Sequence, residues 1–338
     1  MPPDFTSLDE MMPEKILITG GAGFIGSFLA ESLLKDGFAV TVADNFSTGS
    51  MDNLAAVKDH PRLTVLKLDV VENAAQTAEL VNAADCIFHL AAAVGVEMVV
   101  NDPVHTLLTN VRGTENVLVP AAQAKKRIIL ASTSEVYGKS TGELFKETDD
   151  LHLGSPHHSR WSYACSKLLD EFILMAYHQQ QALPGTVVRF FNTVGPRQTG
   201  RYGMVVPRFV KAALAGEPLK VYGDGQQSRC FCHVADVVRA LQGLLHCKES
   251  IGRICNIGSQ ELISIEDLAK LTISHLNSSS ELERIPYEQA YGKGFEDMRR
   301  RRPDTSEINK LTGWVPEKNL RDIIDDTANY FRANGGAC

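Results

Sequence analysis

Two side chains four residues apart, Tyr163 and Lys167, have the types and spacing for acid–base chemistry. Residues at positions i and i+4 share one face of a helix, so the lysine ammonium can lie close to the phenol. A free phenol has a pKa of about 10, and a neighbouring cation favours its ionised form. The pair therefore predicts a tyrosine that acts as a general base near neutral pH. The spacing alone is common, so this interpretation depends on what precedes it in the chain.

A group of hydroxyl and carboxylate side chains precedes the pair. Thr133, Ser134 and Glu135 follow an apolar run at 127–131, which predicts a buried strand. Ligands of open parallel sheets bind outside the carboxyl ends of the strands. We therefore expect these three side chains to face a cofactor crevice.

A glycine-rich turn early in the sequence predicts a nucleotide site. Gly20, Gly23 and Gly26 separate an apolar run at 15–19 from an amphipathic helical pattern. In this strand–turn–helix context, the glycines let the backbone approach a pyrophosphate at the positive end of the helix. Asp44 ends the next predicted strand, where a carboxylate accepts hydrogen bonds from a ribose 2′-hydroxyl and repels a 2′-phosphate. No arginine occupies the next three positions, so the predicted cofactor is NAD rather than NADP.

Strands and helices alternate through the first part of the chain. The remaining strands are predicted at 38–43, 63–68, 86–90 and 186–190, and helices at 73–83, 103–124 and 161–180. The alternation predicts an α/β fold, with a Rossmann-type doubly wound parallel sheet in an NAD-binding domain at 14–189. After residue 190, proline, glycine and arginine become frequent and the alternation ends. Residues 190–338 are therefore predicted to form a smaller mixed α/β substrate-binding lobe, partly interleaved with the first, and residues 1–13 a loose leader.

Three further features have local interpretations. His89 ends a predicted strand and is interpreted as structural. Ser264, which precedes an apolar stripe, predicts a capped helix start. The four consecutive arginines at 299–302 fit either a solvated surface or the recognition of phosphate or carboxylate.

Composition excludes several classes of function. The 338 residues carry a net charge of −7 and a pI of about 5.8, which gives no global electrostatic case for binding nucleic acid or an anionic membrane. No apolar run reaches the length of a membrane span. The seven cysteines are odd in number and lack CxxC spacing, which favours reduced thiols in a cytoplasmic protein, and no metal site is predicted.

Taken together, the motifs resemble the extended short-chain dehydrogenase/reductase family, the NAD-dependent nucleotide-sugar epimerases, dehydratases and decarboxylases. The resemblance covers nearly the whole chain. Besides the motifs above, it includes Asp69, His89-Leu90-Ala91, Asn110, Asn192-Thr193-x-Gly195-Pro196-Arg197, Val221-Tyr222-Gly223-Asp224-Gly225, Ser228-Arg229, His233-Val234-x-Asp236 and Asn256-Ile257-Gly258.

The resemblance implies a retained NAD that oxidises the C4 hydroxyl of a nucleotide sugar. Tyr163 would take the hydroxyl proton, Lys167 would lower the pKa of Tyr163 and bind the nicotinamide ribose, and Thr133 would hydrogen-bond O4. It also implies a homodimer formed through helices 103–124 and 161–180. The implied cofactor contacts are Gly20, Gly23, Phe24, Ile25, Gly26, Asp44, Asn45, Asp69, Val70, Leu90, Ala91, Ala92, Asn110, Tyr163 and Lys167, and the implied substrate contacts are Asn192, Arg197, Val206, Tyr222, Arg229 and Arg301.

Several reactions can follow C4 oxidation. The sequence Thr-Ser-Glu-Val-Tyr-Gly at 133–138 is similar to UDP-glucuronate decarboxylases, and Arg301-Arg302-Pro303 fits a motif of the same enzymes. Simple 4-epimerases need no carboxylate at the position that Glu135 occupies in this chain. TDP-glucose 4,6-dehydratases have an Asp-Glu pair where this chain has Ser134-Glu135, although Thr-Ser-Glu also occurs in GDP-mannose 4,6-dehydratases.

We therefore favour a UDP-glucuronate decarboxylase, with a UDP-glucose or UDP-glucuronate 4-epimerase as the alternative. A 4,6-dehydratase and a non-catalytic NAD-binding regulator are less favoured. Oxidation at C4 of a glucuronate makes a β-keto acid, which loses CO2 readily. Glu135, with Ser134 beside it, would handle proton transfer near C5. Arg301 would neutralise the carboxylate of the substrate. The spacer at 164–166 and the segment 286–298 depart from dedicated UDP-xylose synthases.

Overall fold

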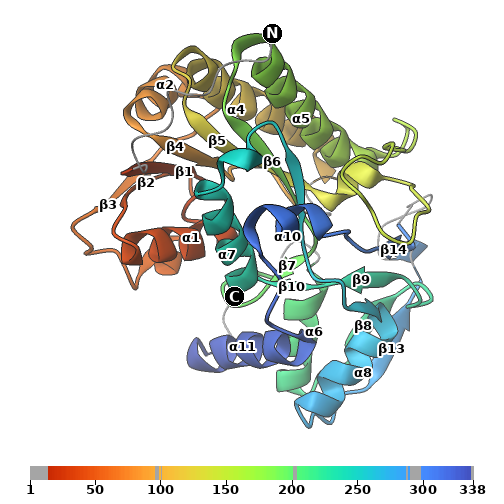
Figure 1. Cartoon of the computed structure of the whole chain (residues 1–338). Coiled ribbons are helices and arrows are strands. Elements are labelled where there is room, and N and C mark those ends of the chain that lie inside the picture. Colours follow the sequence, from red (N-terminus) through yellow and green to blue (C-terminus); the bar gives the residue numbers. More distant parts are fainter. Residues whose placement is uncertain are drawn as a thin grey trace.

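A seven-stranded parallel sheet forms the centre of the larger part of the molecule (Figure 1). The computed structural model describes residues 14–95, 99, 101–200, 204–286, 288–289 and 298–335, so the predicted leader and most of the divergent segment 286–298 lie outside the described residues. In spatial order the strands are β11 (Ile254–Ile257), β6 (Gly185–Phe190), β5 (Arg127–Thr133), β4 (Cys86–His89), β1 (Lys15–Thr19), β2 (Ala39–Asp44) and β3 (Leu63–Lys67). The chain order reverses between β1 and β4, as in a doubly wound sheet. The predicted Rossmann-type α/β fold is confirmed.

Helices cover both faces of this sheet because its strands are apolar on both sides. Ile16 and Ile18 of β1 pack in a core cluster with α1 (Phe24–Lys35) and α7 (Val234–Leu245). Leu17, which points the other way, belongs to the cluster with α2 (Ala74–Ala83), α4 (Pro103–Gln123) and α5 (Ser162–Gln181). Figure 1 shows α2, α4 and α5 together on one side of the sheet and α1 and α7 on the other.

The smaller lobe has a core of its own. Val210, Leu219, Ile265 and Ile323 are buried in one cluster. This cluster joins α6 (Val205–Ala215), β8 (Leu219–Tyr222), α8 (Ile265–His275) and α11 (Leu320–Ala333). Helix α10 (Ser306–Thr312) packs against α7 and β11 in the core of the large part. The smaller lobe also contains the strands β9 (Ser228–Cys230), β12 (Leu262–Ser264), β13 (Leu282–Ile285) and β14 (Arg300–Arg301). Its strands form a three-stranded sheet, β12-β9-β14, and the pair β13-β8. A further pair, β10 (Cys232–His233) with β7 (Thr193–Val194), leads into α7.

The two parts are interleaved along the chain. Strand β11 and helix α7 both follow residue 190, yet they complete the large sheet and its cover. A division at residue 190 therefore does not coincide with the edge of that sheet. The predicted cap at Ser264 is confirmed, because its hydroxyl accepts a hydrogen bond from the Asp267 amide at 3.0 Å.

His89 lies inside the large part of the molecule. Its Nδ1 lies 2.7 Å from Thr19 Oγ1 and its Nε2 lies 3.2 Å from Thr114 Oγ1. Burial, and then the charge of Lys167, lower the pKa of His89 to about 3, so the imidazole is neutral. These contacts are those of a structural histidine, as predicted.

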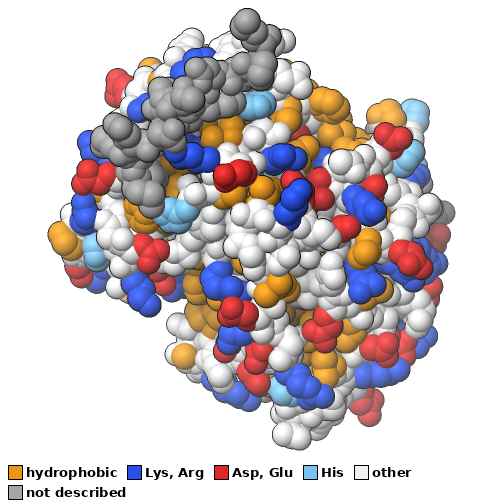
Figure 2. Space-filling view, in the orientation of Figure 1, with side chains coloured by type: hydrophobic (Ala, Val, Ile, Leu, Met, Phe, Trp, Pro, Cys, Tyr) orange, Lys and Arg blue, Asp and Glu red, His pale blue; other side chains and the backbone are white. Residues whose placement is uncertain are grey.

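On the face drawn in Figure 2, basic and acidic side chains are interspersed, without an extended area of one sign among the described residues. None of the described helices combines the length and apolar character needed to cross a membrane.

Candidate active site

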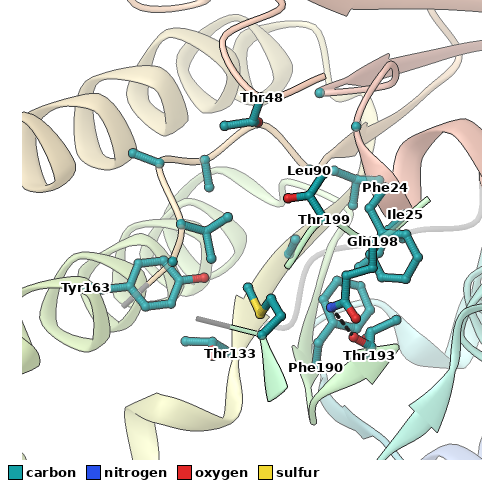
Figure 3. Close-up of a pocket in the computed structure, with 18 of the residues that line it drawn as sticks. Phe24, Ile25, Thr48, Leu90, Thr133, Tyr163, Phe190, Thr193, Gln198 and Thr199 are labelled. Carbon is teal, nitrogen blue, oxygen red and sulfur yellow. Dashed lines mark hydrogen bonds between the residues drawn. The ribbon is translucent and has the colours of Figure 1, made fainter. Parts of the chain in front are cut away.

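A cavity of about 620 Å³ opens at the carboxyl ends of the central strands, and both parts of the molecule line it. Figure 3 shows Tyr163 and Thr133 on one side of this cavity and Phe24 and Ile25 on the other. The predicted site residues that line it are Gly20, Gly23, Phe24, Ile25, Gly26, Asp44, Asn45, Asp69, Val70, Leu90, Ala91, Ala92, Thr133, Ser134, Glu135, Tyr163, Lys167, Asn192, Arg197, Tyr222, Arg229 and Arg301.

Two predicted contact residues do not line the cavity. Asn110 accepts a hydrogen bond from the Ala93 amide at 2.7 Å and donates to Ser166 Oγ at 3.0 Å, so it ties the segment after β4 to α5. Val206 is buried in the core of the smaller lobe. The structure places Asn110 and Val206 in structural contacts, and their predicted contacts with ligands stay predictions.

The glycine-rich turn forms a close backbone cradle. Gly20 has a φ of +71°, and a Cβ there would lie 2.8 Å from the Ala91 amide nitrogen. A Cβ on Gly26 would collide with the Gly20 carbonyl oxygen. At the end of β2, the Asp44 carboxylate accepts hydrogen bonds from the Ala22 and Phe46 amides at 2.9 and 2.8 Å. A turn that excludes side chains at a helix start, with an acid beside it, fits the diphosphate and ribose of a dinucleotide.

Tyr163 and Lys167 both project from α5 into the cavity, but the lysine is paired elsewhere. Lys167 Nζ donates to Asp170 Oδ2 at 2.8 Å, and both side chains are buried. Burial raises the pKa of Tyr163 above its usual value, the carboxylates of Glu135 and Asp170 raise it further, and a hydrogen bond with Thr133 opposes them. The pKa of Tyr163 is therefore raised in the protein alone, and the effect of the Lys167 ammonium on it stays a prediction.

Glu135 is held between two arginines in the lining of the cavity. It lies in the 3-10 turn η3 (Ser134–Tyr137), and both carboxylate oxygens accept hydrogen bonds from Arg160 of η4 (Ser159–Trp161). Arg301 Nη1 donates to Glu135 Oε1 at 3.2 Å. Burial opposes ionisation, but Arg160 and then Arg301 outweigh it and lower the pKa of Glu135 to about 2. Glu135 is therefore a carboxylate at neutral pH and accepts hydrogen bonds rather than donating a proton.

One member of the arginine run enters the site. Strand β14 pairs in parallel with β9, which places Arg301 beside Arg229. Arg301 is buried and donates from Nη2 to Asn192 Oδ1 at 3.0 Å. Arg299 and Arg300 are exposed, and Arg299 pairs with Asp224 at 2.7 Å. The run therefore combines a solvated surface with one site arginine.

Arg197 lines the cavity on the side of the glycine-rich turn. Its backbone has a φ of +67°, and its guanidinium donates to Ser27 Oγ at 3.1 Å and to Glu31 at 2.6 Å. The same group stacks 4.2 Å from the Phe28 ring centroid. These contacts hold the Arg197 guanidinium against α1.

Two charged residues of the site were not predicted. Arg160 lies three residues before Tyr163 and Asp170 three residues after Lys167. That spacing puts side chains on one face of a helix and is the signal that would have found them. Their partners, Glu135 and Lys167, become evident only from the folded contacts.

Comparison with known proteins agrees with this geometry. The family model of GDP-mannose 4,6 dehydratase matches residues 17–327. The chain belongs to this family. Its members include enzymes of the extended short-chain dehydrogenase/reductase type, and the chain is an NAD-dependent enzyme of that type.

Two curated relatives and one solved structure illustrate the family. The chain is 41% identical to UDP-N-acetyl-alpha-D-glucosaminuronate decarboxylase of Bacillus cytotoxicus, over 95% of this chain and 98% of that protein. It is 37% identical to UDP-glucuronic acid decarboxylase 1 of Danio rerio, over 97% and 75% of the two chains. The UDP-glucuronic acid 4-epimerase of Bacillus cereus, solved with UDP-glucuronic acid and NAD, superposes with a TM-score of 0.85 at 28% identity, covering 95% of this chain and 99% of that one.

Proposed function

We propose that this protein is a UDP-uronate decarboxylase that oxidises C4 of the sugar and releases C6 as CO2. The observation that carries the proposal is the charge at the sugar end of the cavity. The charges of Arg160, Arg301 and Arg229 all lower the pKa of Glu135, so three guanidinium groups lie around one buried carboxylate. The C6 carboxylate of a uronate would pair with a guanidinium at this place, whereas the uncharged hexose ring of UDP-glucose supplies no such partner.

The residues of the site support each proton transfer of the reaction. NAD⁺, when bound, supplies the hydride acceptor. Tyr163, hydrogen-bonded with Thr133, is placed to take the C4 hydroxyl proton as C4 is oxidised. The β-keto acid then breaks its C5–C6 bond, and the electron pair moves to the C4 oxygen as an enolate while CO2 leaves. A water molecule that donates a hydrogen bond to the Glu135 carboxylate would protonate C5 and leave hydroxide to the solvent. Tyr163 would return its proton to O4 as C4 takes back the hydride, which completes a UDP-pentose.

The relatives support a UDP-uronate as the substrate and suggest two candidate sugars, glucuronate and N-acetylglucosaminuronate. One curated relative acts on an N-acetylglucosaminuronate and another on a glucuronate, and both are named decarboxylases. A 4-epimerase of UDP-glucuronic acid is the second candidate, because that enzyme binds a uronate in the same fold. The two functions differ in one observable, the fate of C6.

The test is a comparison of three substrates by proton NMR. UDP-glucuronate, UDP-N-acetylglucosaminuronate and UDP-glucose are incubated separately with the purified protein and NAD. We expect a UDP-pentose or its 4-keto form from at least one uronate and no reaction with UDP-glucose. Conversion of a uronate to its C4 epimer with all carbons retained would instead establish the second candidate.

We also propose that the protein forms a homodimer through α4 and α5. These helices pack against each other, yet they expose large apolar side chains. Val104 and Phe172 are each 65% exposed, Leu108 is 43% exposed and Leu169 is 44% exposed. Apolar side chains gathered on two adjacent helices are typical of a subunit interface.

A further inference from the structure

Arg160 makes the most extensive contact with Glu135. The two amino nitrogens of its guanidinium donate to the two carboxylate oxygens, Nη1 to Oε2 and Nη2 to Oε1, the second at 3.3 Å. Arg160 is 5% exposed, and its guanidinium carbon lies 5.4 Å from the centroid of the Trp161 ring. A buried, bidentate pair of this kind fixes both the position and the plane of a carboxylate.

Arg301 contacts the same carboxylate differently. A single nitrogen, Nη1, reaches Glu135 Oε1 at 3.2 Å and also lies 3.4 Å from Ser134 Oγ. Its other amino nitrogen donates to Asn192. An incoming substrate carboxylate can therefore take the Arg301 contact while Arg160 still holds both oxygens of Glu135.

We propose that Arg160 is a positioning residue: it fixes the Glu135 carboxylate beside C5 of the sugar and leaves Arg301 for the substrate carboxylate. Arg160 lies one helical turn before Tyr163, so the same segment places the base at O4 and Glu135 at C5. The inference rests on the proposed decarboxylase function. It assigns to Arg160, through Glu135, control over the face on which a water molecule held by the Glu135 carboxylate delivers a proton to C5 after CO2 has left.

The charges around Glu135 determine how a substitution of Arg160 changes the pKa and the orientation of the Glu135 carboxylate. Arg160 faces it from η4, Arg301 from β14 and Arg229 from β9, while the Tyr163 phenol faces it from α5. Removing the Arg160 guanidinium takes away the largest favourable charge, so the pKa of Glu135 rises. The carboxylate also loses its bidentate anchor, which frees its plane to rotate.

The test follows the fate of C5 in heavy water. In D2O the wild-type enzyme is expected to place one deuteron at a single prochiral position of C5, which proton NMR of the UDP-pentose resolves. Arg160→Gln is expected to distribute deuterium over both positions, to slow CO2 release by about 100-fold, and to move the acidic limb of activity to higher pH. The first formation of NADH is expected to persist, because Tyr163 and the cofactor cradle are unchanged. Arg299→Gln is the matched control, because that side chain is 76% exposed and pairs outside the site, and it should behave as wild type.

A double variant separates positioning from folding. If Arg160 acts through Glu135, Arg160→Gln combined with Glu135→Gln should equal Glu135→Gln alone within about 2-fold. The double variant leaves no uncompensated buried carboxylate. It can therefore be compared with Glu135→Gln even when Arg160→Gln alone fails to fold. Independent, multiplying losses in the double variant would overturn the assignment.

The outcomes distinguish this inference from the proposed function. If the wild-type protein releases no CO2 from either uronate, the decarboxylase function fails and the inference fails with it. If the wild-type protein decarboxylates a uronate and Arg160→Gln keeps a single deuterated position and an unmoved acidic limb, only the role of Arg160 is overturned.

Discussion

Tyr163 is held as a neutral phenol by its surroundings. Burial and two nearby carboxylates raise its pKa, and the ammonium of Lys167 is engaged by Asp170. A base of this kind works through the small ionised fraction, which grows as pH rises. The rate of the first oxidation should therefore increase with pH from neutral into the alkaline range.

Replacing the phenol tests its role as the base. Tyr163→Phe is expected to reduce NADH formation on mixing with a UDP-uronate by about 10²- to 10⁴-fold, because the C4 hydroxyl loses its proton acceptor. Stopped-flow absorbance of NADH measures this. Tyr177→Phe, on the same helix but outside the lining of the cavity, is the control and should leave the rate unchanged. Undiminished NADH formation in Tyr163→Phe would exclude Tyr163 as the base.

Asp170 offers a test with a defined sign. Asp170→Asn removes a carboxylate that raises the pKa of Tyr163, so the alkaline rise in NADH formation should move to lower pH. The same change leaves a buried ammonium without its partner and should lower the free energy of unfolding by about 3–5 kcal/mol. Thermal unfolding and the pH profile measure the two effects. Asp325→Asn, in an exposed pair with His275, should alter neither, and a profile that moves to higher pH would contradict the account.

At the scale of elements, the start of α1 depends on the absence of a side chain. Gly26→Ala would force its Cβ against the Gly20 carbonyl oxygen and to 2.7 Å from Gly21 Cα. Overpacking of this kind costs about 1–3 kcal/mol and distorts the cradle. We expect NAD affinity to fall by about 10-fold or more, measured by calorimetry. Gly243→Ala in α7, where a Cβ would meet only the Thr312 side chain at 3.3 Å, should bind NAD normally.

The strands could be predicted from the sequence because apolar residues dominate them, in a fully buried run in β4 and with exposed polar residues among them in the edge strand β3. The predicted 63–68 and 86–90 correspond to β3 (Leu63–Lys67) and β4 (Cys86–His89). Strand β14 was not predictable in this way: it has two residues, both arginines, and forms only by pairing with β9 about 70 positions earlier. That pairing brings Arg301 beside Arg229.

The site was predictable where a motif names a local geometry and not where a long-range contact decides it. The glycine-rich turn and Tyr163 have signals within a few residues of themselves. Glu135 and Arg160 are 25 residues apart, and only the folded chain pairs them. Asp170 lies three residues after Lys167 on the same helix, a spacing that permits the ion pair but does not decide between Asp170 and Tyr163 as the neighbour of the ammonium.

At the scale of the whole molecule, the exposed apolar surface of α4 and α5 predicts self-association. Phe172→Glu places a charge on this surface and is expected to convert the dimer to a monomer, measured by sedimentation velocity. Val315→Glu changes a side chain that is 52% exposed on neither helix, and it should leave the dimer intact. A Phe172→Glu protein that sediments as the wild type would show that these helices are not the interface.

The most direct test of the central claim follows C6 itself. UDP-glucuronate and UDP-N-acetylglucosaminuronate, each labelled with ¹³C at C6, are incubated with the protein and NAD, and carbon NMR follows the label. The charge of the site predicts that the label of at least one substrate leaves as carbon dioxide and bicarbonate, together with an unlabelled UDP-pentose. Label that stays in a C4-epimerised uronate would contradict decarboxylation and make the protein a 4-epimerase.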